Sequence, residues 1–172
     1  MTSGVYNVLF LCTGNSARSI IAESLLNHLG QNRYRAYSAG SYPSGTVNPL
    51  VLEFLGQQRI STAGARSKSW DEFTVAGSPV LDFVITVCDD AANEACPVWP
   101  GQPVTAHWGV EDPARFMDDP ERARKVISDV FHTLHRRIQL FTSLPASSLD
   151  RLALTAAVRD IGKKTTVAAS ES

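Results

Sequence analysis

Short apolar runs alternate with amphipathic helical patterns along most of this chain. Residues 5–11 (VYNVLFL) and 81–87 (LDFVITV) are rich in β-branched and aromatic residues, which is typical of strands buried in a parallel sheet. Residues 34–40 (YRAYSAG) and 102–110 (QPVTAHWGV) are weaker strand candidates. Because strands alternate with helical segments, the pattern predicts an α/β fold with an open, mostly parallel four-stranded sheet and helices on both faces.

Three helices are indicated by spacing and by their end signals. Residues 17–29 place apolar side chains at four-residue intervals and are followed by a glycine, a natural C-terminal stop. The pairs Asn48-Pro49 and Asp119-Pro120 each combine an N-cap with proline at the first helical position. The second pair begins a long helix with one apolar stripe, made of Ala123, Val126, Ile127, Val130, Leu134, Ile138 and Phe141.

The length of 172 residues suits one ordinary domain with a sizeable core. We expect a main domain over residues 1–145 and a further helix within residues 146–162, from about residue 148 to residue 161. This helix would pack on the domain or on a second subunit, so a monomer and a homodimer both remain open. A flexible tail is expected over residues 163–172, where the composition is biased.

Charge and cysteine content exclude several classes of protein. The net charge is −1, which favours neither a nucleic-acid surface nor a basic membrane patch. No apolar stretch is long enough to cross a bilayer, and the first apolar run lacks the basic residues of a signal peptide. Three cysteines, an odd and small number, argue against a secreted disulfide framework, so we expect a cytoplasmic protein.

The loop after the first strand, residues 12–18 (CTGNSAR), has the composition of an anion site. A turn from strand to helix aims backbone N–H groups inward, and the helix N-terminus adds positive potential, which would favour the thiolate of Cys12. Gly14 and Asn15 tolerate a positive φ. Arg18 can hold an oxyanion with two N–H bonds, and Ser19 can donate to the sulfur. The expected oxyanion-binding residues are Thr13, Gly14, Asn15, Ser16, Ala17, Arg18 and Ser19.

A second cysteine is expected at the same edge of the sheet. Cys12 and Cys88 each follow an apolar strand, and the carboxyl ends of parallel strands meet at one edge. The alternative for Cys12 is a buried structural cysteine, with Arg18 on the surface.

Residues 11–19 (LCTGNSARS) resemble the Cys-x5-Arg signature of low-molecular-weight tyrosine phosphatases and of the arsenate reductases that share their fold. The resemblance covers about residues 5–142. In this family the aspartate of an Asp-Pro pair is the general acid, and the stretch HWGVEDPA gives that role to Asp112. Without the resemblance, Asp112 would be interpreted as an ordinary turn residue.

The resemblance to the arsenate reductases is closest in VCDDAANEACP and HWGVEDPA. The phosphatases typically place an aromatic residue after their Asp-Pro pair, where this chain has Ala114. They also usually carry a second cysteine inside the loop, where this chain has Ala17. Both differences suit a pocket for a small inorganic anion, with arsenate as the substrate and phosphate or sulfate as analogues.

The reductase interpretation gives each cysteine a role. Cys12 would attack arsenic while Asp112 protonates the departing oxygen, and Cys88 would then attack the Cys12 sulfur and release arsenite. Cys96 would next attack Cys88, leaving a Cys88–Cys96 disulfide for an external thiol reductant, thioredoxin or glutathione with glutaredoxin. No bound cofactor is required.

The spacing of Cys88 and Cys96 constrains this relay. If the residues between them are helical, their α-carbons lie ~12 Å apart, whereas a disulfide needs roughly 5.5 Å, so the segment must unwind. The alternative is that Cys96 is a bystander and that glutathione with glutaredoxin resolves Cys88. A zinc site formed by the three cysteines with His107 is not expected, because the spacing matches no common ligand pattern.

Some reductases of this group bind potassium next to the loop. The matching positions are Asn15, Glu23, Ser38 and Lys68. A lysine cannot ligate a cation, but its ammonium can occupy the place of one, so we expect no metal and no potassium requirement. The alternative for Glu23 and Lys68 is a solvated helix face.

Two other functions remain open on sequence alone. One is a phosphatase acting on phosphotyrosine or phosphoarginine. The other is a non-catalytic oxyanion or redox sensor, in which a Cys88–Cys96 disulfide reports oxidation. Neither nucleic acid nor membrane is an expected partner.

Overall fold

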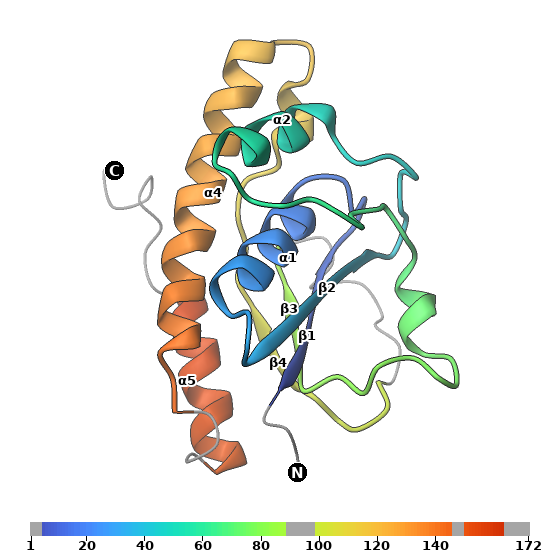
Figure 1. The fold of residues 1–172 in the computed structure, drawn as a ribbon, viewed down its shortest axis with the longest axis vertical. Coiled ribbons are helices and arrows are strands. Elements are labelled where there is room, and N and C mark those ends of the chain that lie inside the picture. The colour runs from blue at the N-terminus through green and yellow to red at the C-terminus, as the bar shows by residue number, and fades with distance from the viewer. Residues whose placement is uncertain (1–4, 89–98, 146–149, 164–172) are drawn as a thin grey trace.

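A computed structural model describes residues 5–88, 99–145 and 150–163. Four strands form its sheet, namely β1 (Tyr6–Cys12), β2 (Tyr34–Gly40), β3 (Phe83–Thr86) and β4 (Val104–His107). They lie in the order β2-β1-β3-β4, and every described neighbouring pair is parallel (Figure 1). The predicted open α/β sheet is confirmed. Cys96 and the expected tail beyond Lys163 lie outside the described residues.

The described α-helices are α1 (Arg18–Leu29), α2 (Pro49–Gln57), α4 (Pro120–Thr142) and α5 (Arg151–Lys163). Short 3-10 helices are η1 (Trp70–Phe73) and η2 (Pro113–Phe116). Both predicted Asx-Pro starts are confirmed: the side chain of Asn48 accepts from the N–H of Leu50, and that of Asp119 accepts from the N–H of Arg122.

Strand β1 is buried on both sides, which explains its unbroken apolar run. Val8 and Phe10 face a large core that also contains buried residues of all four described α-helices. Leu9 and Leu11 face a smaller core, which Phe73 of η1 covers from the other side. The predicted apolar stripe of α4 is buried along its whole length. Strand β1 is therefore held firmly in the middle of the sheet, and its last residue, Cys12, lies at the carboxyl edge.

Helix α5 packs on β4 and on α4, along the side of the molecule where α4 also runs (Figure 1). The indole N–H of Trp108 donates to the carbonyl oxygen of Val158 over 3.1 Å. At Gly162 a β-carbon would collide with the carbonyl oxygen of His107, so the end of α5 lies tightly against the end of β4. The helix begins at Arg151 and ends at Lys163, slightly later than the sequence indicates.

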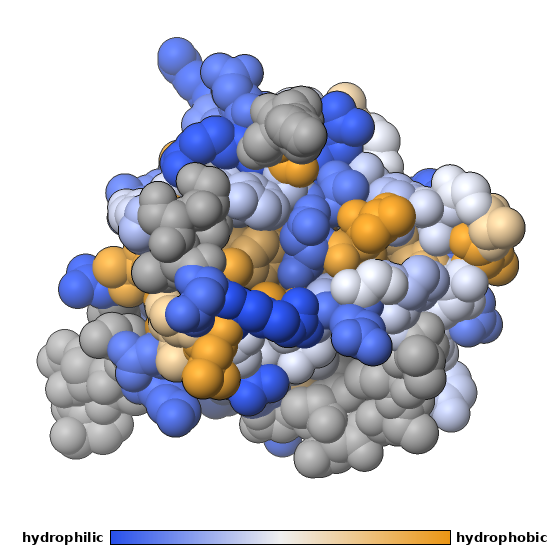
Figure 2. Space-filling model, turned by 90° about the horizontal axis from the view of Figure 1, so that it is seen from below, coloured by the Kyte–Doolittle hydropathy of each residue, from blue (hydrophilic) through white to orange (hydrophobic). Residues whose placement is uncertain are grey.

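Apolar side chains on the surface are dispersed. On the face shown in Figure 2, hydrophobic residues form several separate areas among hydrophilic ones. Large exposed apolar residues include Val80 and Leu152, at 62% and 81%. Among the described helices, none combines the length and apolar character needed to span a membrane.

Candidate active site

Cys12 ends β1 and opens the loop that leads into α1, and it is 2% exposed. Its Sγ lies 2.9 Å from the Oγ of Ser19, in the first turn of α1. Ser19 is fully buried, and the Nδ2 of Asn15 donates to its Oγ over 2.7 Å. The sulfur is thus positioned by a chain of hydrogen bonds that begins at an asparagine of its own loop.

Asn15 has the left-handed backbone conformation expected for this loop, with φ of 46°. It is fully buried, and its Oδ1 accepts from the backbone N–H of Lys68 over 2.8 Å. The side-chain amide therefore bonds Ser19 on one side and the chain before η1 on the other. Both contacts stabilise a conformation that L-residues other than glycine adopt at a cost.

The carbonyl oxygens of the loop are turned away from its concave side. Those of Thr13, Gly14 and Ser16 accept from the N–H groups of a neighbouring segment, namely those of Tyr42, Ser44 and Asn48. Gly40, which begins this segment, approaches so closely that a β-carbon would collide with the carbonyl oxygens of Cys12 and Thr13. A loop whose carbonyl oxygens are bonded to a neighbouring segment leaves its N–H groups available to an anion, which is the arrangement the sequence predicts.

Arg18, the last residue of the loop, forms an ion pair with Asp112. The Nη2 of Arg18 is 3.3 Å from the Oδ2 of Asp112, with the side chains 11% and 31% exposed. The Nη1 of Arg18 also donates to the carbonyl oxygen of Val110 over 3.3 Å. Asp112 caps η2 by accepting from the N–H of Ala114 over 2.9 Å. Asp112 is therefore a turn residue, as the sequence alone suggests, and in addition a neighbour of the arginine.

Cys88 lies at the same edge of the sheet as Cys12, as predicted. The residue before it, Val87, donates its N–H to the carbonyl oxygen of Leu11, next to Cys12. Both cysteines are reduced and buried, at 2% and 1% exposed, and a side-chain hydrogen bond between them affects the ionisation of Cys12. The Oγ1 of Thr13 also lies 3.7 Å from the Cys88 sulfur.

The arrangement of the two thiols affects the ionisation of Cys12. The hydrogen bond with Cys88 and burial raise the pKa of Cys12 well above its ordinary value, while the hydrogen bonds with Ser19 lower it. The sequence favoured a lowered value. The expectation considered the loop and the helix alone. It placed Cys88 at the same edge of the sheet but left out the effect of that thiol, and of burial, on the pKa of Cys12.

The residues Glu23, Ser38 and Lys68 form a polar cluster behind the loop. The hydroxyl of Ser38 donates to the carboxylate of Glu23, and the Nζ of Lys68 donates to the carbonyl oxygen of Arg66 over 2.9 Å. Burial raises the pKa of Glu23 and lowers the pKa of Lys68, and each charge opposes the shift of the other. Lys68 is 8% exposed, so the alternative of a solvated lysine is wrong.

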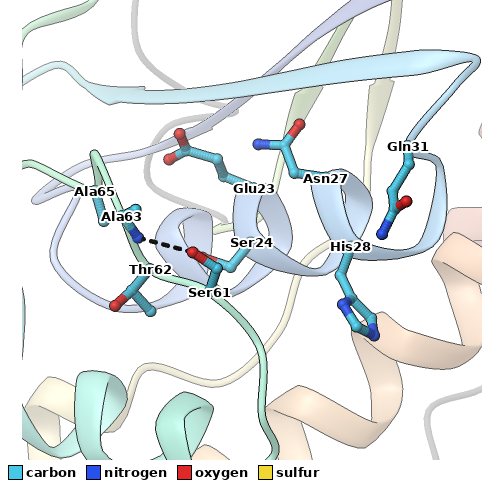
Figure 3. A pocket seen from close by; sticks show the side chains of 9 residues that line it. All are labelled: Glu23, Ser24, Asn27, His28, Gln31, Ser61, Thr62, Ala63 and Ala65. Carbon is cyan, nitrogen blue, oxygen red and sulfur yellow. Dashed lines mark hydrogen bonds between the residues drawn. The ribbon is translucent and has the colours of Figure 1, made fainter.

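A polar cavity of about 190 Å³ adjoins this cluster. Figure 3 shows Glu23, Asn27 and His28 of α1 along one side, with Gln31 just after the helix, and residues 61–65 on the other side. The Oγ of Ser61 accepts from the N–H of Ala63, which fixes the loop at this rim. The cavity lies beside Glu23 rather than at Cys12.

The sequence predicts no zinc site formed by the three cysteines and His107. The structure describes all of these residues except Cys96. Within residues 5–88, 99–145 and 150–163, no three acidic, histidine or cysteine side chains form a group that could hold a metal ion. The Nδ1 of His107 lies 2.7 Å from the Oγ1 of Thr86. Cys96 is outside these ranges, so its position relative to Cys88 stays a prediction.

Two contributors to the site were missed from sequence. Gly40 matters only through its contact with the loop, which no sequence pattern indicates. Arg137 donates to the carbonyl oxygen of Gly109, three residues before Asp112. A charged residue within the apolar repeat of α4 was the available signal for Arg137.

Comparison with known proteins agrees with this geometry. A model of the family described as low molecular weight phosphotyrosine protein phosphatase matches residues 7–147. The chain belongs to this family. Relatives within it include proteins described as arsenate reductases. One from Shouchella clausii is 34% identical over 134 residues, covering 78% of this chain and 93% of that protein. One from Bacillus subtilis is 31% identical over the same shares.

Solved structures of the family superimpose on this chain. A thioredoxin-dependent arsenate reductase of Corynebacterium glutamicum has a TM-score of 0.57 and 31% identity, and the match covers 82% of this chain and 65% of that chain. An arsenate reductase of Archaeoglobus fulgidus has a TM-score of 0.58 and 26% identity, with 77% and 98% covered. A tyrosine phosphatase of T. tengcongensis, 22% identical with a TM-score of 0.61, shares the fold.

Proposed function

We propose that this protein is an arsenate reductase in which Cys12 is the nucleophile and Cys88 the first resolving thiol. The observation that carries the proposal is that two buried, reduced cysteines, Cys12 and Cys88, lie together at the carboxyl edge of the sheet, where the N–H of Val87 donates to the carbonyl oxygen of Leu11. A phosphatase needs one nucleophilic thiol, whereas a two-electron reduction needs a second thiol within reach of the first. The relatives described as arsenate reductases over most of this chain support the same function.

The first step is attack of Cys12 on arsenic. The thiol proton passes to an oxygen of the incoming arsenate, and the hydrogen bond with Ser19 stabilises the thiolate that forms. The inward N–H groups of residues 13–19 and the guanidinium of Arg18 hold the arsenate oxygens. Asp112, beside Arg18, donates a proton to the departing oxygen, which leaves as water. A bond between Cys12 sulfur and arsenic(V) results, with no change yet in oxidation state.

The second step is the reduction. The Cys88 thiolate attacks the Cys12 sulfur, and the electron pair of the sulfur–arsenic bond passes to arsenic. Arsenite leaves, and a Cys12–Cys88 disulfide holds the oxidising equivalents. Two thiols are oxidised and one arsenate is reduced, so the electrons balance.

The remaining steps restore the thiols. Cys96 attacks Cys88, frees Cys12 and forms a Cys88–Cys96 disulfide, which an external thiol reductant then reduces. A thioredoxin is the first reductant to test, because a relative of known structure is described as thioredoxin-dependent. Glutathione with glutaredoxin is the second. Phosphate is the expected competing anion, since an arsenate reductase of the same fold is described in a phosphate-binding state.

Phosphatase activity is the second candidate function. The proximity of Arg18 to Asp112 favours it, because that pair with Cys12 also suffices for phosphoester hydrolysis. Ala114, which replaces the aromatic residue typical of the phosphatases, leaves less surface to hold an aryl or peptide leaving group.

The two functions are separated by one set of assays. Arsenate-dependent NADPH oxidation is measured with thioredoxin and its reductase, then with glutathione and glutaredoxin, beside hydrolysis of para-nitrophenyl phosphate. We expect turnover with arsenate and weak hydrolysis at most. Efficient hydrolysis without arsenate turnover would reject the reductase, and tight anion binding without either activity would indicate a sensor.

A further inference from the structure

One charged residue lies on the buried side of α4. Arg137 comes between Leu134 and Ile138, and it is only 4% exposed. Burial lowers the pKa of its guanidinium, and no carboxylate in the described part of the chain opposes that effect. Burying a cation without an acidic partner is unfavourable. A leucine or methionine would fit the apolar stripe without this penalty, so the arginine requires an explanation.

The guanidinium of Arg137 contacts the backbone between β4 and η2. Its Nη1 donates to the carbonyl oxygen of Gly109 over 3.2 Å. Its Nε is buried and has no hydrogen-bond partner among the described residues. Among the described residues, the guanidinium of Arg137 thus binds the peptide group of Gly109 while its Nε donor stays unused.

The next carbonyl group of the same segment is bound by a second arginine. The carbonyl oxygen of Val110 accepts from the Nη1 of Arg18, and its N–H donates to the carbonyl oxygen of Val87 over 3.0 Å. Two consecutive carbonyl oxygens, those of Gly109 and Val110, are thus each bound by an arginine. One arginine comes from α4 and the other from the loop of the nucleophile. Asp112 follows two residues after Val110.

We propose that Arg137 is a positioning residue that fixes the segment of residues 109–112, so that the Asp112 carboxylate faces Arg18 and the bound oxyanion. The proposal rests on the proposed function, in which Asp112 is the proton donor. Arg137 itself touches backbone rather than substrate. Proton transfer depends steeply on the placement of the donor, so a small displacement of the segment lowers the rate.

The first test does not depend on activity. Hydrogen exchange over residues 108–112 is compared between the unmodified protein, Arg137→Met and the control Arg136→Met, which alters the adjacent exposed residue. We expect exchange of the Val110 amide to become about tenfold faster in Arg137→Met and to stay unchanged in the control. Unchanged exchange in Arg137→Met overturns the proposal.

The second test measures whether Arg137 affects proton donation by Asp112. Arsenate kinetics are measured across pH for the same variants and for Arg137→Lys, which keeps one donor and serves if the methionine variant does not fold. We expect kcat to fall about five- to tenfold in Arg137→Met with little change in KM, an altered alkaline limb, and partial rescue in Arg137→Lys. If the loss of activity is only proportional to the loss of folded protein, and the pH profile is unchanged, the proposal is overturned. Lack of arsenate turnover in the unmodified protein would instead reject the proposed function, and the exchange experiment would still decide on Arg137.

Discussion

The guanidinium of Arg18 lies 3.3 Å from the carboxylate of Asp112, although the two residues come from distant parts of the chain. The first belongs to the opening turn of α1 and the second caps η2. The pair places the group that would hold an oxyanion beside the group that would protonate its departing oxygen. The same guanidinium also binds the carbonyl oxygen of Val110, so its orientation is fixed by two contacts.

Replacing Arg18 by lysine tests whether this orientation matters beyond charge. A lysine keeps the positive charge but cannot make the planar two-point contact of a guanidinium with an oxyanion. We expect Arg18→Lys to lower kcat/KM for arsenate on the order of 10²-fold or more. Steady-state kinetics with arsenate measure this, with Arg136→Lys on the exposed side of α4 as the matched control. Near-normal kinetics would show that Arg18 has a structural role only.

Replacing Cys12 by serine tests the nucleophile. A serine hydroxyl stays protonated near neutral pH and attacks poorly, so Cys12→Ser should abolish arsenate reduction and any hydrolysis of para-nitrophenyl phosphate. The hydrogen bond with Ser19 can be kept by the new hydroxyl, so the fold should survive, which thermal unfolding would verify. Substantial turnover by the folded variant would remove Cys12 from the mechanism.

The ionisation of Cys12 gives a prediction in terms of pH. The hydrogen bond with Cys88 raises the pKa of Cys12, and that with Ser19 lowers it. Removing the first contact by Cys88→Ala should therefore shift the pH profile of Cys12 alkylation to lower pH. Ser19→Ala should shift the profile to higher pH. Iodoacetamide labelling, followed by mass spectrometry across pH, measures both, and a Cys88→Ala profile that stays in place would contradict the assigned cause.

The sheet, its helices and the edge that carries both thiols were predictable from sequence because each depends on local signals. The run before Cys12 is apolar at every position, since β1 is buried on both sides, and Asn48 with Pro49 marks a helix start by its chemistry alone. The raised pKa of Cys12 was not predicted, because it arises from burial and from a contact with Cys88, which follows β3, and both depend on the folded chain. The same holds for Arg137, whose role depends on a carbonyl oxygen that only the folded chain brings near.

Lys68 supports a prediction about cations. Its ammonium and the carboxylate of Glu23 favour each other's charged form, so an added potassium ion has little to contribute there. Replacing potassium chloride by choline chloride should leave arsenate turnover unchanged. Lys68→Met should lower stability by about 1–3 kcal/mol, because the buried carboxylate loses its counter-charge. Thermal unfolding measures this, with exposed Lys125→Met as control, and a severalfold stimulation of the unmodified protein by potassium would refute the assignment.

Replacing Cys88 and Cys96 separates reductase from phosphatase. Hydrolysis of para-nitrophenyl phosphate requires Cys12, Arg18 and Asp112, with water completing the cycle. Reduction needs a second thiol to take up the Cys12 sulfur and release arsenite. We therefore expect Cys88→Ser to stop multiple turnover with arsenate while leaving any hydrolysis nearly intact.

Cys96→Ser should have an intermediate effect. The Cys12–Cys88 disulfide should form, and turnover should then stall if the reductant is thioredoxin, or continue if glutathione can reach Cys88. Mass mapping of disulfides after one pulse of arsenate follows these species directly. The Cys12–Cys88 disulfide should accumulate in Cys96→Ser, and the Cys88–Cys96 disulfide in the unmodified protein. If neither forms and Cys88→Ser turns over arsenate normally, the three-thiol relay is wrong, and the shared set of Cys12, Arg18 and Asp112 would then favour a phosphatase.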